Sequence, residues 1–81
     1  MRIQLKLFAL ARQLADAETI AVELPPSAVV ADLRHAAAQQ YPPLADVLPH
    51  ATFAIDAQYV HDNTPVPPDA EVACIPPVSG G

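Results

Sequence analysis

The residues best suited to chemistry are the last six of the sequence, Pro76-Pro77-Val78-Ser79-Gly80-Gly81. Gly80 and Gly81 are the chain's two glycines, whereas average usage predicts roughly six in a chain of this length. Two prolines favour an extended start, and two glycines make a thin end without side chains. Fully extended, such a segment reaches about 20 Å. We therefore expect an arm that enters a narrow tunnel in a partner and carries the carboxylate of Gly81 at its tip.

A terminal carboxylate is ionised at neutral pH and resists nucleophilic attack, so it needs activation by a partner. Formation of an acyl-adenylate is the usual route. Once activated, the carboxyl group accepts sulfur to become a thiocarboxylate, or accepts a lysine amine to become an isopeptide. A plain frayed terminus is the alternative, and the absence of glycine elsewhere in the chain disfavours it. We expect a co-substrate that is not catalytic alone.

Side chains elsewhere do not form a recognisable site in the sequence. His35, His50 and His61 share no helical i, i+3 or i+4 spacing, so no metal-ligand cluster is predicted. Cys74 is the only cysteine, and its apolar neighbours indicate a buried strand position rather than a reactive thiolate. No upstream glycine is available for a loop that cradles phosphate. We therefore expect neither a self-contained hydrolase nor a nucleotide-binding enzyme, and no bound metal or cofactor.

Charge is unevenly distributed along the chain, whose formal net charge is −5. The fixed cations are Arg2, Lys6, Arg12 and Arg34, and every fixed charge after them is acidic. Because nucleic acids require cations clustered along one face, a basic protein partner is the better expectation. Arg12 and Arg34 are expected on helices, where they either bind anions or form a solvated face. The longest apolar run is far shorter than the roughly 20 residues that span a bilayer, so we expect a cytoplasmic protein with no membrane partner.

Hydrophobic periodicity predicts the elements that hold the arm. Apolar residues alternate in 1–7, 19–24 and 71–75, the pattern of strands with one face in a core. Helical spacing predicts a short helix with the apolar face Leu7, Leu10, Ala11 and Leu14, and a main helix within 27–42. The remaining expectations are one helical turn at 44–48, two short extended pieces around Ala57-Gln58 and a surface loop over 61–69.

These elements predict an α+β fold in which one main helix covers one face of a mixed sheet. We expect the chain to divide into a carrier domain, residues 1–75, and a C-terminal tail, residues 76–81. The uncovered face of the sheet must meet something if it is apolar. Phe8, Ile75, Pro76, Pro77 and Val78 are therefore the expected partner contacts, with a core position equally open for Phe8.

The segment from Glu71 to Gly81 resembles the C-terminal signature of the small, sulfur-carrying subunit of molybdopterin synthase. Leu7-Phe8-Ala9 is similar to the first strand and loop of that family, and Val30-Ala31-Asp32-Leu33 is similar to the start of its main helix. The resemblance implies a ubiquitin-like β-grasp fold. This sequence departs from the family at Val29, where the family usually has a Thr that caps the helix. We therefore expect either that Ser27 caps the helix from further back or that the helix start is weaker. The sequence also departs at Asp56, where the family's central hairpin often has Asn, and at Pro68-Asp69-Ala70, which replaces a Gly-containing turn.

The same resemblance implies a sequence of partners. An activating enzyme uses ATP to adenylate Gly81, a sulfur donor converts it to a thiocarboxylate, and the tail, with Ser79 and Gly80, enters the large synthase subunit. There it supplies dithiolene sulfur to cyclic pyranopterin monophosphate. The implied assembly is a heterotetramer of two large and two small subunits, in which the catalytic side chains belong to the large subunit.

Three alternatives remain at this point. The first is a sulfur carrier for thiamine or cysteine synthesis, which uses the same tail chemistry. The second is a ubiquitin-like protein modifier, although Lys6 is the only lysine and leaves little scope for branched self-conjugation. The third is a β-grasp interaction module, whose function would survive deletion of Gly81.

Overall fold

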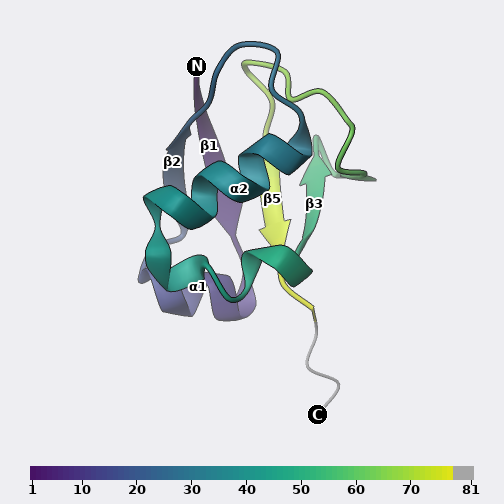
Figure 1. Cartoon of the computed structure of the whole chain (residues 1–81). Helices are drawn as coiled ribbons and strands as arrows, with labels where there is room; N and C mark the ends of the chain where they lie inside the picture. The colour runs from purple at the N-terminus through teal and green to yellow at the C-terminus, as the bar shows by residue number, and fades with distance from the viewer. Residues whose placement is uncertain (78–81) are drawn as a thin grey trace.

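A computed structural model describes residues 1–77, which form a five-stranded sheet with helices packed on one side (Figure 1). The strands lie in the order β2-β1-β5-β3-β4. The predicted α+β class, with a mixed sheet covered on one face, is confirmed. The elements are β1 Arg2–Leu7, α1 Ala9–Ala15, β2 Thr19–Glu23, α2 Val30–Gln40, the short 3₁₀ turns η1 Pro42–Leu44 and η2 Leu48–His50, β3 Thr52–Ile55, β4 Gln58–Val60 and β5 Val72–Ile75.

The sheet is mixed because β5 lies between two strands of opposite direction. It runs parallel to β1 and antiparallel to β3, while β1 pairs antiparallel with β2 and β3 pairs antiparallel with β4. Figure 1 shows β1 and β5 running toward the end of the molecule where α1 lies. The C-terminal strand is therefore a central strand of the sheet, held by hydrogen bonds on both sides.

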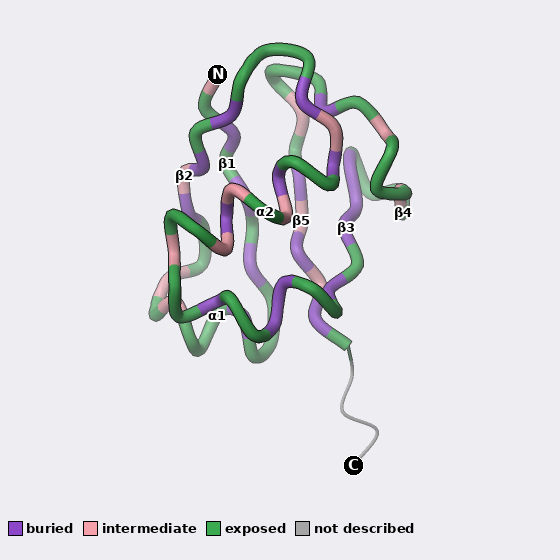
Figure 2. The backbone as a smooth tube through the Cα atoms, in the orientation of Figure 1, coloured by how far each residue is buried: buried purple, intermediate pink, exposed green. Residues whose placement is uncertain are grey.

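Strand alternation separates the core from the outer face. In β1 the side chains of Ile3, Leu5 and Leu7 are buried and the residues between them are exposed, as a period of two requires. Figure 2 shows buried positions alternating along the strands beneath α2. On the helix side, Val30, Leu33 and Ala37 are the buried residues of α2. The core is thus the layer between the sheet and α2.

The main helix begins at Val30, three positions later than the first residue of the predicted range. Ser27 does not cap it: its φ is 68°, and the N-cap residue Val29 has no side-chain cap hydrogen bond. The Val29 N–H instead donates to Asp32 Oδ2 at 2.9 Å. Asp32 thus lies in the first turn, where a carboxylate interacts favourably with the helix dipole.

A distant loop supplies the rest of the cap. Val30 N donates to the carbonyl of Thr64 and Ala31 N donates to the carbonyl of Asp62, each at 2.9 Å. These two N–H groups are among the four that a helix start leaves without an intrahelical acceptor. Val66 in the same loop is buried, and its N–H donates to Ala28 O at 2.9 Å. The segment 61–69, predicted as a surface loop, is therefore mostly exposed but docked on the start of α2.

The predicted apolar face of the short helix does not exist as one surface. Leu7 belongs to β1 and is buried, and Ala11 is the buried residue of α1. Leu10 and Leu14 are 50% and 41% exposed. The helical spacing predicted the helix correctly, but the continuous apolar face was wrong because a strand ends within it.

Within residues 1–77, which contain no glycine, the backbone is left-handed at five positions, namely Ala9, Asp16, Ser27, Asp56 and Ala57. Asp56 and Ala57 form the two-residue turn between β3 and β4, which explains the two short extended pieces expected there. Positive φ at both central residues is the pattern of a type I′ turn, for which Asn-Gly is the preferred sequence. Alanine at the second position carries a steric cost that glycine would avoid.

Candidate functional site

The candidate site starts where β5 ends, because the expected tail, residues 76–81, follows this strand directly in the sequence. Ile75 pairs with Thr52 of β3, Pro76 is buried and Pro77 is exposed. Proline has no N–H to continue a strand ladder, so pairing stops after Ile75. The root of the tail, residues 75–77, is thus attached directly to a central strand of the sheet.

The outer face of the sheet beside this root contains a shallow hollow with an alanine floor. The register places Lys6 opposite Ala73, Ala73 opposite Ala54 and Ala54 opposite Tyr59. One row therefore crosses β1, β5, β3 and β4, with two small side chains at its centre and two long ones at its ends. The hollow is lined by Lys6, Phe8, Ala54, Asp56, Ala57, Tyr59, Glu71, Ala73 and Ile75. We call this set the outer-face patch.

The large apolar side chains of the outer-face patch are accessible to a partner. Phe8 is 40% exposed and Tyr59 is 74% exposed, and Ile75 is half-buried beside the root of the tail. Lys6 Nζ lies 5.4 Å from the centroid of the Phe8 ring, in position for a cation–π interaction. Phe8 is therefore a surface residue, which settles the choice between a core and a surface position.

Acidic residues border the opposite end of the outer-face patch. Asp56 N donates to Glu71 O at 2.9 Å, and Glu71 N donates to Asp56 Oδ1 at 3.1 Å. These reciprocal bonds tie the β3–β4 turn to the start of β5, and both acidic residues line the patch. A partner surface that combines an apolar side chain with a basic group would fit this end of the patch.

The predicted site residues divide between the described part of the chain and the rest. Phe8 and Ile75 belong to the outer-face patch, Pro76 packs inside the fold, and Pro77 is exposed at the root of the tail. Val78, Ser79, Gly80 and Gly81 lie outside the described residues. Contact of these residues with a partner stays a prediction.

Sequence reasoning missed the rest of the patch. Ala54, Tyr59 and Ala73 lie on three different strands and meet only through the register of β3, β4 and β5. Ala54 and Ala73 have no chemical signal of their own. Tyr59 offered one, because tyrosine is enriched in protein–protein interfaces.

Cys74 is buried in β5, as predicted. Burial raises the pKa of its thiol to about 11, an effect that the charge of Arg34 partly offsets. The thiol is therefore protonated at neutral pH and is a poor nucleophile. Cys74 is a core residue and has no part in the candidate site.

The two helical arginines each have partners within the chain. Arg12 pairs with Glu18 at 2.8 Å on the surface. Arg34 donates to the carbonyls of Leu48 and Ala51 and pairs with Asp62, so it is neither an open anion site nor part of a solvated face. Within residues 1–77, no three His, Cys, Asp or Glu side chains gather in a metal-binding arrangement. No helix of this part is long and apolar enough to cross a bilayer.

Similar solved structures share the whole architecture. Small archaeal modifier protein 1 from Haloferax volcanii is 26% identical, with a TM-score of 0.85 and complete coverage of both chains. A putative molybdopterin converting factor subunit 1 from Pyrococcus furiosus is 24% identical over 96% of this chain and 99% of its own, with a TM-score of 0.83. In a complex of subunits 1 and 2 of the molybdopterin-converting factor from Helicobacter pylori, the similar chain is 21% identical over 100% of both chains, with a TM-score of 0.68.

These likenesses confirm the ubiquitin-like β-grasp fold expected from the sequence. No curated protein sequence matches the chain. The model of the ThiS family matches residues 5–81, which include the outer-face patch, the tail root and the Gly80-Gly81 end. The chain therefore belongs to the ThiS family, among the ubiquitin-like sulfur carriers and modifiers.

Proposed function

We propose that this chain is the sulfur carrier subunit of a molybdopterin synthase. The observation that carries the proposal is the position of the tail root. β5 is central in the sheet, its last residue borders an accessible apolar patch, and the residues after it lead to Gly80-Gly81. A partner that binds the outer-face patch would therefore receive the tail from a fixed point.

The proposed reaction begins at the carboxylate of Gly81, in the cytoplasm. An activating enzyme catalyses attack of this carboxylate on ATP, which gives an acyl-adenylate and releases pyrophosphate. A sulfur donor then displaces AMP, so that one carboxylate oxygen is replaced by sulfur. Cys74 takes no part in these steps, since its thiol is buried and protonated. ATP is bound by the activating enzyme, and no cofactor is assigned to the carrier.

Two named neighbours support the molybdopterin assignment. The Pyrococcus furiosus protein is described as subunit 1 of the converting factor, and the Helicobacter pylori structure contains subunits 1 and 2 together. A large-subunit partner that accepts the thiocarboxylate, in a heterotetramer with two copies of each chain, is the corresponding proposal here. The acceptor of the sulfur is cyclic pyranopterin monophosphate.

The test is mass spectrometry of the intact chain after incubation with the activating enzyme, ATP and a sulfur source. The expected result is a mass increase equal to the exchange of one oxygen for sulfur, located in the C-terminal peptide and absent without ATP. Addition of the large subunit and the pterin substrate should then reverse this increase. A chain that never gains sulfur would refute the carrier assignment. One that gains sulfur but never transfers it to the pterin would instead favour thiamine or cysteine synthesis.

Protein modification is the second candidate, and the likeness to small archaeal modifier protein 1 favours it. In this case the activated Gly81 forms an isopeptide with a lysine of a target protein. Conjugates of higher mass that survive denaturation, and that disappear when Gly81 is deleted, would establish this function. Sulfur transfer and conjugation share the adenylation step, so both assays are run on the same activated chain.

A further inference from the structure

An open sheet has two free edges, and in this fold they are β2 and β4. A free edge presents unpaired N–H and C=O groups, so it invites the addition of a strand from another molecule. β4 contains three residues and β2 contains five. A very short edge strand is a poor template, so β2 is the edge that needs protection.

The hydrogen bonds of β2 show which of its backbone groups face outward. Leu24 N donates to Met1 O at 2.7 Å, and Glu18 O accepts from Leu7 N at 2.8 Å. At both ends of β2, an even-numbered residue that flanks the strand is therefore hydrogen-bonded to the β1 side. Since antiparallel pairs alternate, the backbone groups of Thr19, Ala21 and Glu23 point to the open edge.

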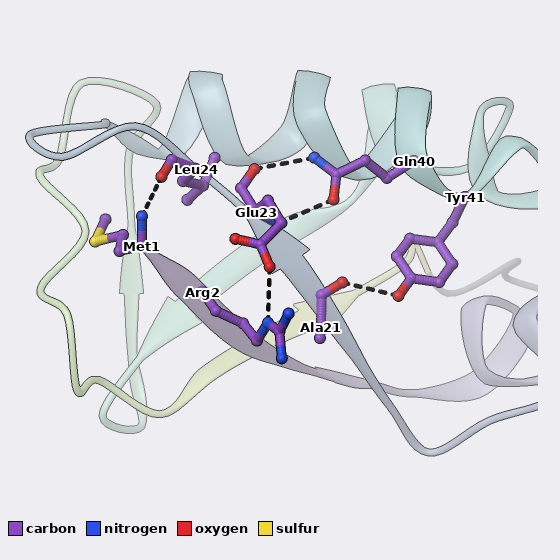
Figure 3. A network of polar contacts seen from close by, with 7 residues as sticks. All are labelled: Met1, Arg2, Ala21, Glu23, Leu24, Gln40 and Tyr41. Atoms are coloured by element: carbon purple, nitrogen blue, oxygen red, sulfur yellow. Dashed lines mark hydrogen bonds and ion pairs between the residues drawn. The ribbon is translucent and has the colours of Figure 1, made fainter.

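Residues at the end of α2 occupy half of these six outward groups. Gln40 Nε2 donates to Glu23 O, and Glu23 N donates to Gln40 Oε1, both at 2.9 Å. Tyr41 Oη donates to Ala21 O at 2.8 Å. Figure 3 shows the Gln40 amide facing the Glu23 backbone and the Tyr41 ring reaching toward Ala21. The side-chain amide of Gln40 makes the same donor and acceptor pair that a neighbouring strand would make.

The two side chains start from a fixed position. Tyr41 N donates to Ala37 O at 2.9 Å, which continues the helical pattern, and the Tyr41 side chain is half-buried against the core. Arg2 Nε pairs with Glu23 Oε1 at 2.7 Å on the outer side, so Glu23 is held from both directions. The contact between the end of α2 and the edge of β2 is therefore held in place on both sides by other parts of the fold.

We propose that Gln40 and Tyr41 close the β2 edge and thereby prevent a second copy of this chain from adding to the sheet through β2. This role of Gln40 and Tyr41 does not depend on whether Gly81 carries sulfur or forms an isopeptide. The proposal assigns a role in interaction to two residues outside the tail and the outer-face patch. It also means that partners recognise the monomer through a face of the fold and not by extending its sheet at β2.

The test compares the wild type with a Gln40→Met, Tyr41→Phe double variant. Met has nearly the length of Gln but cannot make the paired hydrogen bonds, and Phe lacks only the hydroxyl group. Gln39→Ala is the matched control, because Gln39 is an exposed neighbour on the same helix. Each protein is examined by sedimentation over a wide range of concentration, and amide hydrogen exchange is measured residue by residue.

The wild type and the Gln39→Ala control should be monomers with a protected Glu23 amide. In dilute solution the double variant should exchange this amide about fivefold faster or more, as loss of one net hydrogen bond implies. At higher concentration it should associate, with new protection at residues 19–23. A folded double variant that stays monomeric, or associates only through the outer-face patch, would overturn the proposal. If the double variant does not fold, at least one single variant must show the same association for the proposal to stand.

Discussion

Replacement of Arg34 by leucine is expected to destabilise the fold by about 3–4.5 kcal/mol. Arg34 Nη1 donates to the carbonyls of Leu48 and Ala51, both at 2.6 Å, and Nη2 lies 2.7 Å from Asp62 Oδ1. The guanidinium carbon lies 4.9 Å from the centroid of the Phe53 ring. One side chain thus joins α2 to the turn η2, to the start of β3 and to the loop that caps α2.

The magnitude follows from how far each partner is buried. The Arg34 side chain is 21% exposed, so the two carbonyls that lose a charged donor are only partly rehydrated, at a cost of roughly 1–1.5 kcal/mol each. The Asp62 carboxylate is largely exposed, so the ion pair contributes about 0.5 kcal/mol. The contact with Phe53 contributes about 0.5–1 kcal/mol. A domain of 81 residues has a total stability of roughly 4–12 kcal/mol, so this loss would be easy to detect.

The assay is equilibrium unfolding in guanidinium chloride, followed by circular dichroism. A lower midpoint with an unchanged slope reports lost stability without a change in the unfolded state. Arg12→Leu is the matched control, since Arg12 also pairs with a carboxylate but only on the surface, and it should cost less than about 1 kcal/mol. Asp62→Asn keeps the carbonyl contacts and should also cost less than Arg34→Leu. Equal losses for Arg34→Leu and Arg12→Leu would show that the buried carbonyl contacts contribute nothing.

Three further predictions address the turn, the thiol and the patch. Ala57→Gly should stabilise the fold by about 0.5–1 kcal/mol in thermal melts, because φ is 70° at this residue. Ala45→Gly, at a right-handed position, should not, and equal effects would contradict the steric argument. Because burial raises the pKa of Cys74 from 9.0 to about 11, the folded state retains this proton longer than the unfolded state. Stability should therefore fall as pH rises from about 9 to 11, and a Cys74→Ala variant with the same slope would refute that cause. Phe8→Asp should weaken binding to the large subunit tenfold or more in calorimetry, whereas Leu14→Asp, at 41% exposure against 40% for Phe8, should leave it unchanged. Equal losses in both variants would remove the outer-face patch as the docking surface.

Local patterns were sufficient to predict most of the elements. The alternation of Ile3, Leu5 and Leu7 and the helical spacing of Val30, Leu33 and Ala37 reflect which face of an element is buried. Each pattern is short in sequence and independent of the rest of the chain. The start of α2 was less predictable because its cap comes from the carbonyls of Asp62 and Thr64, about thirty positions away in the sequence.

The sequence by itself determined most of the strands and helices, the α+β class and a glycine pair reserved for the last two positions, whereas the helical turn expected at 44–48 is instead two short turns, η1 and η2. It also identified the residues of the tail root, since these lie next to one another in the chain. Only the tertiary structure decided that this root belongs to a central strand and that two alanines form the floor of the patch beside it. The same holds for Gln40 and Tyr41 at the β2 edge. Strand order and register join residues that are far apart in the sequence, and no local periodicity records those pairings.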